Sequence, residues 1–213
     1  MKIRWLGHAC FALVSKSGTR IITDPYDEST GYVIPPVEAD FITVSHDHFD
    51  HSTVSAVQGQ PQVIRGKGEF KIKDIQARGV LTFHDNAGGM RRGQNTAFVF
   101  DIDGIRVCHL GDLGHVLNSQ QKAEIGKVDV LLIPTGGTYT IDPSLAQQVC
   151  LQLNPHLIIP MHYRTDALAF PLDTVDSFLK KIGGGRRLGQ STIELEKEDL
   201  ASLIRAVYVL EYR

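Results

Sequence analysis

A cluster of potential metal ligands occupies residues 46 to 51, which read His-Asp-His-Phe-Asp-His. Five of these six positions carry an imidazole or a carboxylate, the donors that borderline divalent ions such as zinc accept. The mainly apolar run 41–45 comes directly before the cluster. The pattern therefore predicts a metal site that emerges from the end of a β-strand.

The spacing within this cluster suggests two metal positions. Residues two apart in an extended chain project to the same side, so His46 and His48 can bind one ion together. If the chain turns after His48, then Asp50 and His51 point to a neighbouring position. The cluster therefore favours two ions side by side over one.

Further ligands must come from distant strand ends, because one short motif supplies too few donors for two ions. Three candidates, His84, Asp112 and His162, each come directly after an apolar, strand-like run. Placing ligands in loops at one edge of a rigid sheet is how α/β architectures build a site. We therefore expect these three side chains to join the cluster at one sheet edge.

The elements that must position these residues alternate between strands and helices. Ser17-Gly18 and Asp103-Gly104 are hairpin signals, and the nearly continuous apolar run Val128–Ile133 is typical of a strand covered on both faces. The residue patterns predict further strands at 2–5, 10–14, 20–23, 41–44, 62–65, 75–83, 96–102 and 105–109, and helices at 52–57, 118–122, 144–153 and 173–182. The alternating segment 205–212 is expected to be an edge strand, able to pair within its own sheet or with a second subunit. This order of elements fits two sheets with helices outside.

With these motifs in place, the chain resembles the metallo-β-lactamase superfamily over nearly its whole length. The supporting segments are 7–9, 23–25, 45–51, 84 with 92–96, 110–112, 134–137 and 160–163. The set is most similar to a compact branch of metal-dependent hydrolases related to the bacterial ascorbate phosphate lactonases. The resemblance implies an α/β (α+β) fold: a four-layer αββα sandwich of two mixed sheets with outer helices, and two metals in a groove at its edge.

The resemblance also implies a role for each candidate ligand. The first ion would be held by His46, His48 and His84, the second by Asp50, His51 and His162, and Asp112 would bridge the two. Asp24, which ends a strand before Pro25, would support the ligand loop by hydrogen bonding without touching metal.

The expected chemistry is hydrolysis, because a metal-bound water can fall from a pKa of about 15.7 to about 7. We expect a hydroxide held between the ions to attack a small ester, lactone or phosphoester. Asp112 would bridge the ions, Asp50 is a candidate base as well as a ligand, and His115 is a candidate proton donor. The two roles of Asp50 stay open, since a ligand and a base make competing claims on the same oxygens.

Three side chains are candidates for contact with the substrate: His8, Arg92 and Tyr139. Arg92 lies in the glycine-rich loop that follows His84, and a guanidinium there can bind a phosphate or carboxylate in bidentate fashion. Tyr139 follows Gly136-Gly137 and can donate a hydrogen bond.

Two other functions stay open at this point. One is a metal-dependent phosphodiesterase or nuclease, and the other is a non-catalytic, metal-containing ligand-binding protein of the same fold. A net charge of −2 gives no general attraction to phosphate backbones, so nucleic acid is not an expected partner. Zinc is the expected ion, although His and Asp ligands also admit manganese or iron.

Length and composition fit one intracellular domain. A chain of 213 residues with 42% hydrophobic content suffices for one sizeable core, so we expect a single domain over 1–213. The three cysteines are odd in number and lie in apolar stretches, which favours a reducing cytosol over disulfides. No signal-like segment and no run approaching about 18 apolar residues occurs, so we expect a soluble, cytoplasmic protein without a membrane partner.

Overall fold

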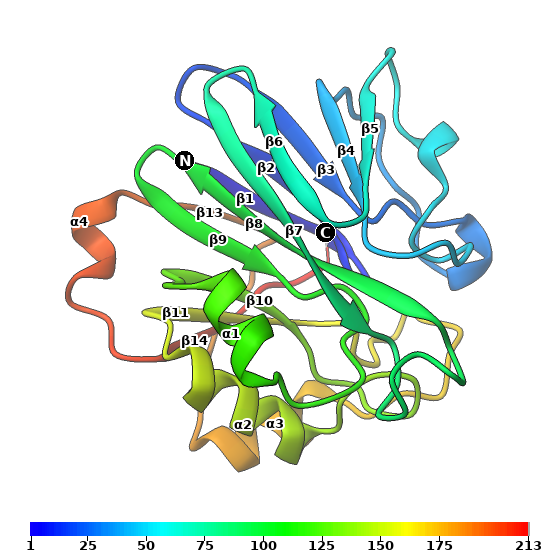
Figure 1. The fold of residues 1–213 in the computed structure, drawn as a ribbon, viewed down its shortest axis with the longest axis vertical. Helices are drawn as coiled ribbons and strands as arrows, with labels where there is room; N and C mark the ends of the chain where they lie inside the picture. Colours follow the sequence, from blue (N-terminus) through cyan, green and yellow to red (C-terminus); the bar gives the residue numbers. More distant parts are fainter. Residues whose placement is uncertain (213) are drawn as a thin grey trace.

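Two mixed β-sheets packed face to face form the centre of the molecule (Figure 1). The structure is a computed structural model and describes residues 1–212. In the six-stranded sheet the order is β13 (Thr192–Glu194), β1 (Lys2–Gly7), β2 (Cys10–Val14), β3 (Arg20–Thr23), β4 (Phe41–Val44) and β5 (Gln62–Arg65). In the eight-stranded sheet the order is β12 (Arg186–Arg187), β14 (Ala206–Val209), β11 (Leu157–Met161), β10 (Val130–Pro134), β9 (Ile105–His109), β8 (Gln94–Ile102), β7 (Ile75–Phe83) and β6 (Gly68–Ile72).

Strand direction brings the ends of many strands to one edge of the sandwich. In the six-stranded sheet β1, β3 and β4 run the same way, because β2 pairs antiparallel with both β1 and β3 and β4 pairs parallel with β3. In the other sheet β7, β9, β10 and β11 share one direction for the same kind of reason. The segments that follow these strands therefore leave each sheet at a single edge.

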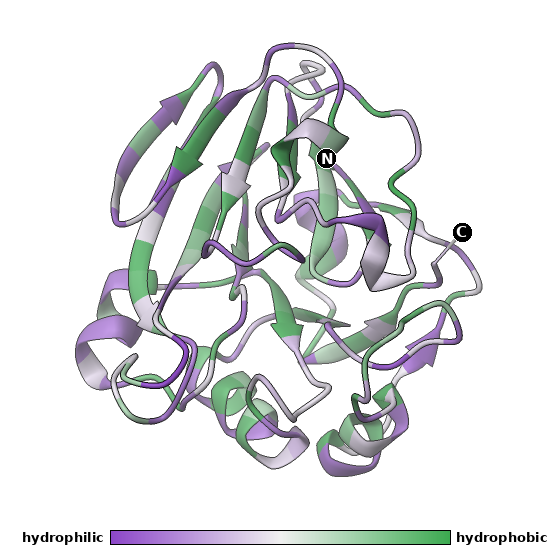
Figure 2. Cartoon of the chain, turned by 90° about the vertical axis from the view of Figure 1, so that its right-hand side faces the viewer, coloured by the Kyte–Doolittle hydropathy of each residue, from purple (hydrophilic) through white to green (hydrophobic). Residues whose placement is uncertain are grey.

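The main core lies between the sheets. It is built from inward-facing apolar side chains of both sheets, including Ile3, Trp5, Phe11, Phe98 and Leu132. Strands β10 and β11 are buried at every position, as expected when helices cover the face turned away from the other sheet. Figure 2 shows hydrophobic residues, coloured green, along several of the strands.

The outer face of the eight-stranded sheet is covered by α1 (Ser119–Ile125), α2 (Pro143–Leu153) and α3 (Val175–Ile182). Helix α2 starts where the Asp142 carboxylate accepts the backbone N–H groups of Ser144 and Leu145, and it ends at Asn154 in the left-handed conformation. Its residues Ala146, Val149 and Cys150 are buried against the sheet.

The outer face of the six-stranded sheet carries no α-helix among residues 1–212 and is covered by loops instead. Tyr26, Tyr32 and Leu168 from these loops pack on Ile22 and Ile42 of the sheet. The loops contain two short 3-10 turns, Glu28–Thr30 and Val54–Ala56. A further short helix, α4 (Lys197–Leu200), places Leu200 against the main core.

Most of the expected strands and three of the four expected helices are confirmed, with shifted ends. The helix predicted over 52–57 is wrong: only the 3-10 turn Val54–Ala56 forms there, and the Gln58 N–H, which a longer α-helix would bond back to Val54, bonds to the Val37 carbonyl instead. Strands β6, β12 and β13 and helix α4 were not predicted.

The C-terminal strand is not an edge strand as predicted. Strand β14 lies between β11 and β12, both of which pair with it in parallel. A second subunit cannot add to this strand, and self-association of the chain stays a prediction. Within residues 1–212 no helix combines the length and apolar character needed to cross a bilayer.

Candidate metal centre

The structure brings all seven predicted ligands together at the shared sheet edge. His46, His48, Asp50 and His51 follow β4, while His84, Asp112 and His162 come after β7, β9 and β11. Two backbone hydrogen bonds join the sheets here, from Thr96 N to the Ser45 carbonyl (2.8 Å) and from His162 N to the His8 carbonyl (3.1 Å). Ligand loops from both sheets are therefore held at a fixed separation.

His46, His48 and His84 form the first ligand group. One nitrogen from each lies within 4.8 Å of the others, and the rings of His46 and His84 are 4.7 Å apart. Burial lowers the pKa of His46 to about 3, and it also lowers the pKa of His84. Both imidazoles are therefore neutral at physiological pH, which is the form that binds a metal.

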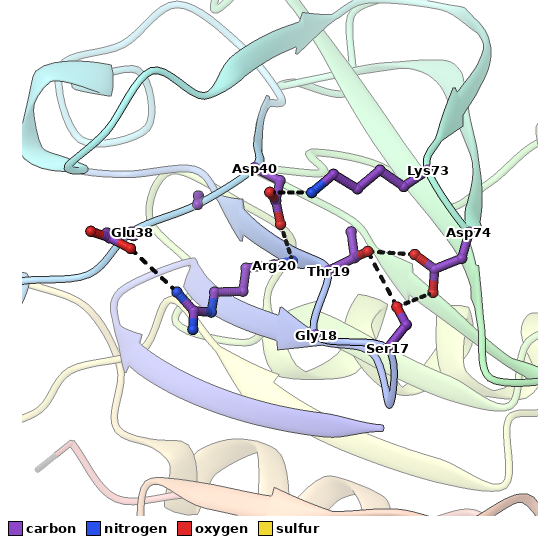
Figure 3. Close-up of a pocket in the computed structure, with 9 residues that line it drawn as sticks. Ser17, Gly18, Thr19, Arg20, Glu38, Asp40, Lys73 and Asp74 are labelled. Atoms are coloured by element: carbon purple, nitrogen blue, oxygen red, sulfur yellow. Dashed lines mark hydrogen bonds and ion pairs between the residues drawn. The ribbon is translucent and has the colours of Figure 1, made fainter.

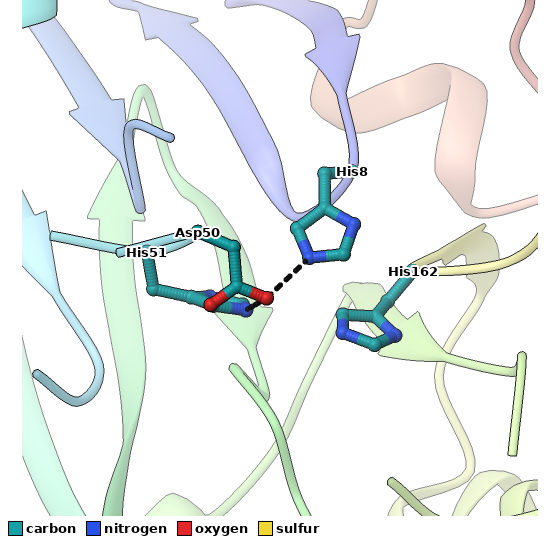
Figure 4. A group of neighbouring side chains, drawn as sticks. All are labelled: His8, Asp50, His51 and His162. Atoms are coloured by element: carbon teal, nitrogen blue, oxygen red, sulfur yellow. Dashed lines mark hydrogen bonds and ion pairs between the residues drawn. The ribbon is translucent and has the colours of Figure 1, made fainter. Parts of the chain in front are cut away.

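Asp50, His51 and His162 form the second group, together with His8 at the end of β1 (Figure 4). One ligand atom from each of these four side chains lies within 4.8 Å of the others. The sequence predicted that His8 contacts substrate, but its side chain is completely buried beside Asp50. The structure thus places His8 beside Asp50 of the second ligand group and not among the residues that line the neighbouring cavity.

Asp112 lies between the two groups. Its Oδ2 is 3.3 Å from His84 Nε2 and 3.2 Å from His162 Nε2, and its Oδ1 is 3.2 Å from His51 Nε2. Burial alone would raise the pKa of Asp112, but the neighbouring His162 and His51 bring it well below its usual range. A carboxylate in this place can bridge two cations.

Several ligand atoms lack the hydrogen-bond partner that buried polar atoms normally have. His46 Nε2, His51 Nε2 and Asp112 Oδ1 are buried, face one another, and have no hydrogen bond to any atom of residues 1–212. Burial would lower the pKa of His51, but Asp112 and then Asp24 raise it well above its usual value. The same negative field favours a divalent cation, so the donor set fits a metal.

Asp24 lies behind the ligands and holds two of them. Its carboxylate accepts hydrogen bonds from Ser45 N (2.8 Å), Ser45 Oγ (2.6 Å) and His51 Nδ1 (2.9 Å). A proton held on Nδ1 of His51 by Asp24 would leave Nε2, which faces Asp112, as the ring atom available to a metal. Ser45 Oγ also lies 2.9 Å from His46 Nδ1, so one carboxylate orients ligands of both groups.

Asn95 performs a similar task for Asp112 and was missed as a site residue. Its Oδ1 accepts the Asp112 N–H (2.9 Å), while its Nδ2 donates to Thr82 Oγ1 and the Leu110 carbonyl. A buried amide in the otherwise mainly apolar strand β8 is the sequence signal that could have found it.

His115 is not part of the site. Its Nε2 accepts the Phe83 N–H (3.2 Å) and its Nδ1 donates to the Val116 carbonyl (2.9 Å). Both ring nitrogens are used within the loop, and His115 does not line the cavity beside the ligands, which argues against the predicted proton-donor role. Closeness to Asp112 in sequence did not bring His115 to the ligands.

A cavity of about 560 Å³ opens beside the ligands, and both remaining substrate candidates line it. The Arg92 guanidinium lies 5.0 Å from the centre of the Tyr139 ring, while Phe49 and Phe170 form an aromatic wall. The loop that carries Arg92 is fixed by Asp85, whose carboxylate accepts four backbone N–H groups from residues 87–92. The cavity therefore combines one positively charged side chain, Arg92, with apolar surface next to the metal ligands.

A second cavity, of about 460 Å³, lies at the opposite end of the sandwich (Figure 3). Its charged side chains pair with each other, Lys73 with Asp40 and Arg20 with Glu38. Asp74 in turn accepts from nearby hydroxyl groups. These groups are already satisfied, so this cavity has no comparable means of binding a ligand.

A two-sheet sandwich with a His and Asp cluster at one edge defines a metalloprotein of the metallo-β-lactamase fold. Residues 2–162 match the family model described as the beta-lactamase superfamily domain, and the chain belongs to this superfamily as a metal-dependent hydrolase. The predicted α/β fold class of two mixed sheets is thereby confirmed, with loops in place of the helical layer expected on the six-stranded sheet.

Relatives agree with this assignment. The chain is 34% identical to a UPF0173 protein of Pyrococcus furiosus over 196 residues, 80% of this chain and 87% of that protein. It is 29% identical over 191 residues to a UPF0173 metal-dependent hydrolase of Thermoplasma acidophilum, covering 78% of this chain and 84% of the relative.

Solved structures give the same picture. A Thermotoga maritima protein, described as a candidate Zn-dependent hydrolase of the metallo-β-lactamase superfamily, shares 46% identity and a TM-score of 0.82 over 99% of this chain and 98% of its own. The short form of human tRNase Z shares the fold alone, with 12% identity and a TM-score of 0.57 over 78% of this chain and 93% of its own.

Proposed function

We propose that the chain is a binuclear hydrolase that cleaves a small ester, lactone or phosphoester, with zinc as its native ion. The observation that carries this proposal is the position of Asp112 between two separate ligand groups. A single metal position would leave one group without a role. Two divalent ions supply Lewis acidity toward the substrate and lower the pKa of bound water enough to give hydroxide at neutral pH.

The cavity supports a small substrate that carries an anionic group. Arg92 is the one Lys or Arg among the side chains that line this cavity, and its guanidinium makes no hydrogen bond within residues 1–212. Its guanidinium is free to bind a carboxylate or phosphate in bidentate fashion. Phe49, Tyr139 and Phe170 offer surface to an apolar part of the same molecule.

The chain's own residues can orient such a substrate. Arg92 would hold the anionic end, so that the scissile bond lies near Asp112 and Asp50, which also line the cavity. Asp50 lies within the second ligand group, and as a ligand its oxygens are not free to act as a general base.

Nuclease activity receives less support from the cavity. Three aspartates and a single arginine line it, which is a poor match for a polyanionic backbone. A net charge of −2 adds no general attraction. We therefore place nucleic acids outside the expected partners.

Metal analysis followed by a substrate panel tests the proposal. Purified protein is analysed by plasma mass spectrometry, and turnover of chromogenic esters, lactones and phosphodiesters is measured with and without chelator. Two ions per chain with chelator-sensitive turnover is the expected result. Two ions without turnover on any bond type would favour the ligand-binding alternative, and one ion or none would refute the binuclear site.

Matched substrates test the role of Arg92. Neutral esters are compared with esters of the same length that end in a carboxylate. The wild type should prefer the charged member, Arg92→Gln should abolish the preference, and Arg92→Lys should keep part of it because the charge remains. An equal preference in wild type and Arg92→Gln would contradict the assignment of Arg92.

A further inference from the structure

His8 is held rigidly at the end of β1. Its backbone adopts a left-handed conformation (φ 50°) just after a register shift in the pairing of β1 with β2. Its carbonyl accepts hydrogen bonds from Trp5 Nε1 (3.0 Å) and from His162 N (3.1 Å). A non-glycine residue in this conformation persists only when its surroundings fix it.

The fixed backbone directs the His8 ring at Asp50 (Figure 4). His8 Nε2 lies 3.2 Å from Asp50 Oδ2, and the His8 ring packs against His162 with centroids 4.1 Å apart. The side chain is completely buried, and its Nδ1 has no hydrogen-bond partner within residues 1–212. The hydrogen bond to Asp50 is therefore the contact that accounts for an imidazole at this position.

The chemistry of this contact fixes the direction of the hydrogen bond. An ionised carboxylate only accepts, so His8 must carry its proton on Nε2 and donate it to Asp50. Asp50 stands in the turn that follows His48, where the His51 N–H bonds to the His48 carbonyl, and its side chain is partly exposed toward the cavity. A partly exposed carboxylate at the edge of the cavity can adopt several orientations, and a hydrogen-bond partner is needed to fix one of them.

We propose that His8 is a positioning residue that donates Nε2–H to Asp50 and thereby sets the affinity of the second metal position. The proposal rests on the binuclear function proposed above. Partners of this kind, which hydrogen-bond a metal-ligating side chain, typically change metal affinity by about 10–100-fold when they are removed. His8 acts in this way through Asp50 and does not itself bind the ion.

Two substitutions distinguish this role from direct ligation. His8→Gln places an amide N–H near the position of Nε2 and can still donate to Asp50. His8→Phe keeps a ring against His162 and Phe170 but has no donor. His156→Gln, at a partly buried histidine bonded to the Leu203 carbonyl, serves as the matched control.

Cobalt(II) titrations of metal-free protein, followed by calorimetry and by the visible spectrum, measure each binding step without any need for activity. In His8→Phe the second step should weaken about 10–100-fold while the first stays unchanged. His8→Gln and His156→Gln should bind like the wild type. Circular dichroism confirms that each variant is folded.

Other results would overturn the proposal in recognisable ways. If His8→Phe bound both ions like the wild type, His8 would have no role in the site. If His8→Gln lost the second ion as completely as His8→Phe, the imidazole itself would be a ligand. If the wild type bound a single ion, the binuclear function would fail together with this role of His8.

Discussion

Replacing Asp24 with Asn should lower the metal affinity of the second position, although no candidate metal ligand is substituted. Burial alone would raise the pKa of Asp24, but the hydrogen bond from His51 and the nearby His109 have the larger combined effect. The pKa of Asp24 is therefore below its usual value, and the native group is a carboxylate. An Asn side chain keeps one acceptor oxygen, which the Ser45 N–H can use, and turns the other oxygen into a donor. That donor would face Nδ1 of His51, which is itself a donor in the native protein.

Two donors facing each other in Asp24→Asn should lower both the stability of the fold and the affinity for the second ion. Either the bond to His51 is lost, or His51 moves its proton to Nε2 and can no longer bind a metal through that atom. Loss of one hydrogen bond to a charged group costs about 1.5–3 kcal/mol of folding free energy. At about 2–4 °C per kcal/mol for a chain of this size, the melting temperature should fall by about 3–12 °C. Affinity for the second ion should fall by about 10–100-fold.

Thermal unfolding of the metal-free protein and cobalt(II) titration measure these two effects separately. Asp166→Asn, a substitution of an exposed aspartate, controls for the change in net charge. If Asp24→Asn kept both the melting temperature and the second-ion affinity of the wild type, the proposed fixing of the His51 tautomer by Asp24 would be refuted.

Three further substitutions test other parts of the site. Asp112→Asn should reduce both metal content and turnover, because the negative charge of the bridging side chain is removed; full occupancy with full activity would show that Asp112 does not bridge. Gly114→Ala should destabilise the fold by about 1–3 kcal/mol and weaken the first ion, since an added Cβ would overlap the backbone of His84 and Asp85; urea unfolding and metal analysis measure both. Asp85→Ala should raise KM for anionic esters more than it lowers kcat, because the loop that carries Arg92 loses its carboxylate anchor; an unchanged KM would count against this.

That the seven candidate ligands lie together could be predicted because metal chemistry restricts the residue types that take part. His and Asp at the ends of apolar runs are rare combinations, and the parallel strands β9, β10 and β11 carry their ends to one edge whatever the details of packing. The fold class follows from the same runs. Hydrophobic pattern and residue type are enough to predict a site when its chemistry allows few alternative residues.

The surroundings of His8 and His115, and the place of β14 in its sheet, could not be predicted, because they depend on which loops and strands meet in space. His8 meets Asp50 because the segments that follow β1 and β4, two strands separated by β2 and β3 in one sheet, come together at the sheet edge, and no local pattern contains this contact. His115 stands three positions after Asp112, yet its turn directs both ring nitrogens to backbone groups. Strand β14 has the sequence of an edge strand and is covered by β12, whose two residues give no strand signal of their own.

Both ligand groups draw on both sheets, and this links metal binding to the packing of the sandwich. In the first group His46 and His48 come from the six-stranded sheet and His84 from the other. In the second group His162 alone comes from the eight-stranded sheet. An ion in either position would therefore join the two sheets, and its binding free energy would add to the free energy of unfolding. Because the ligand spacing is set by the contact between sheets, a substitution that shifts one sheet against the other should lower metal affinity even when it changes no ligand.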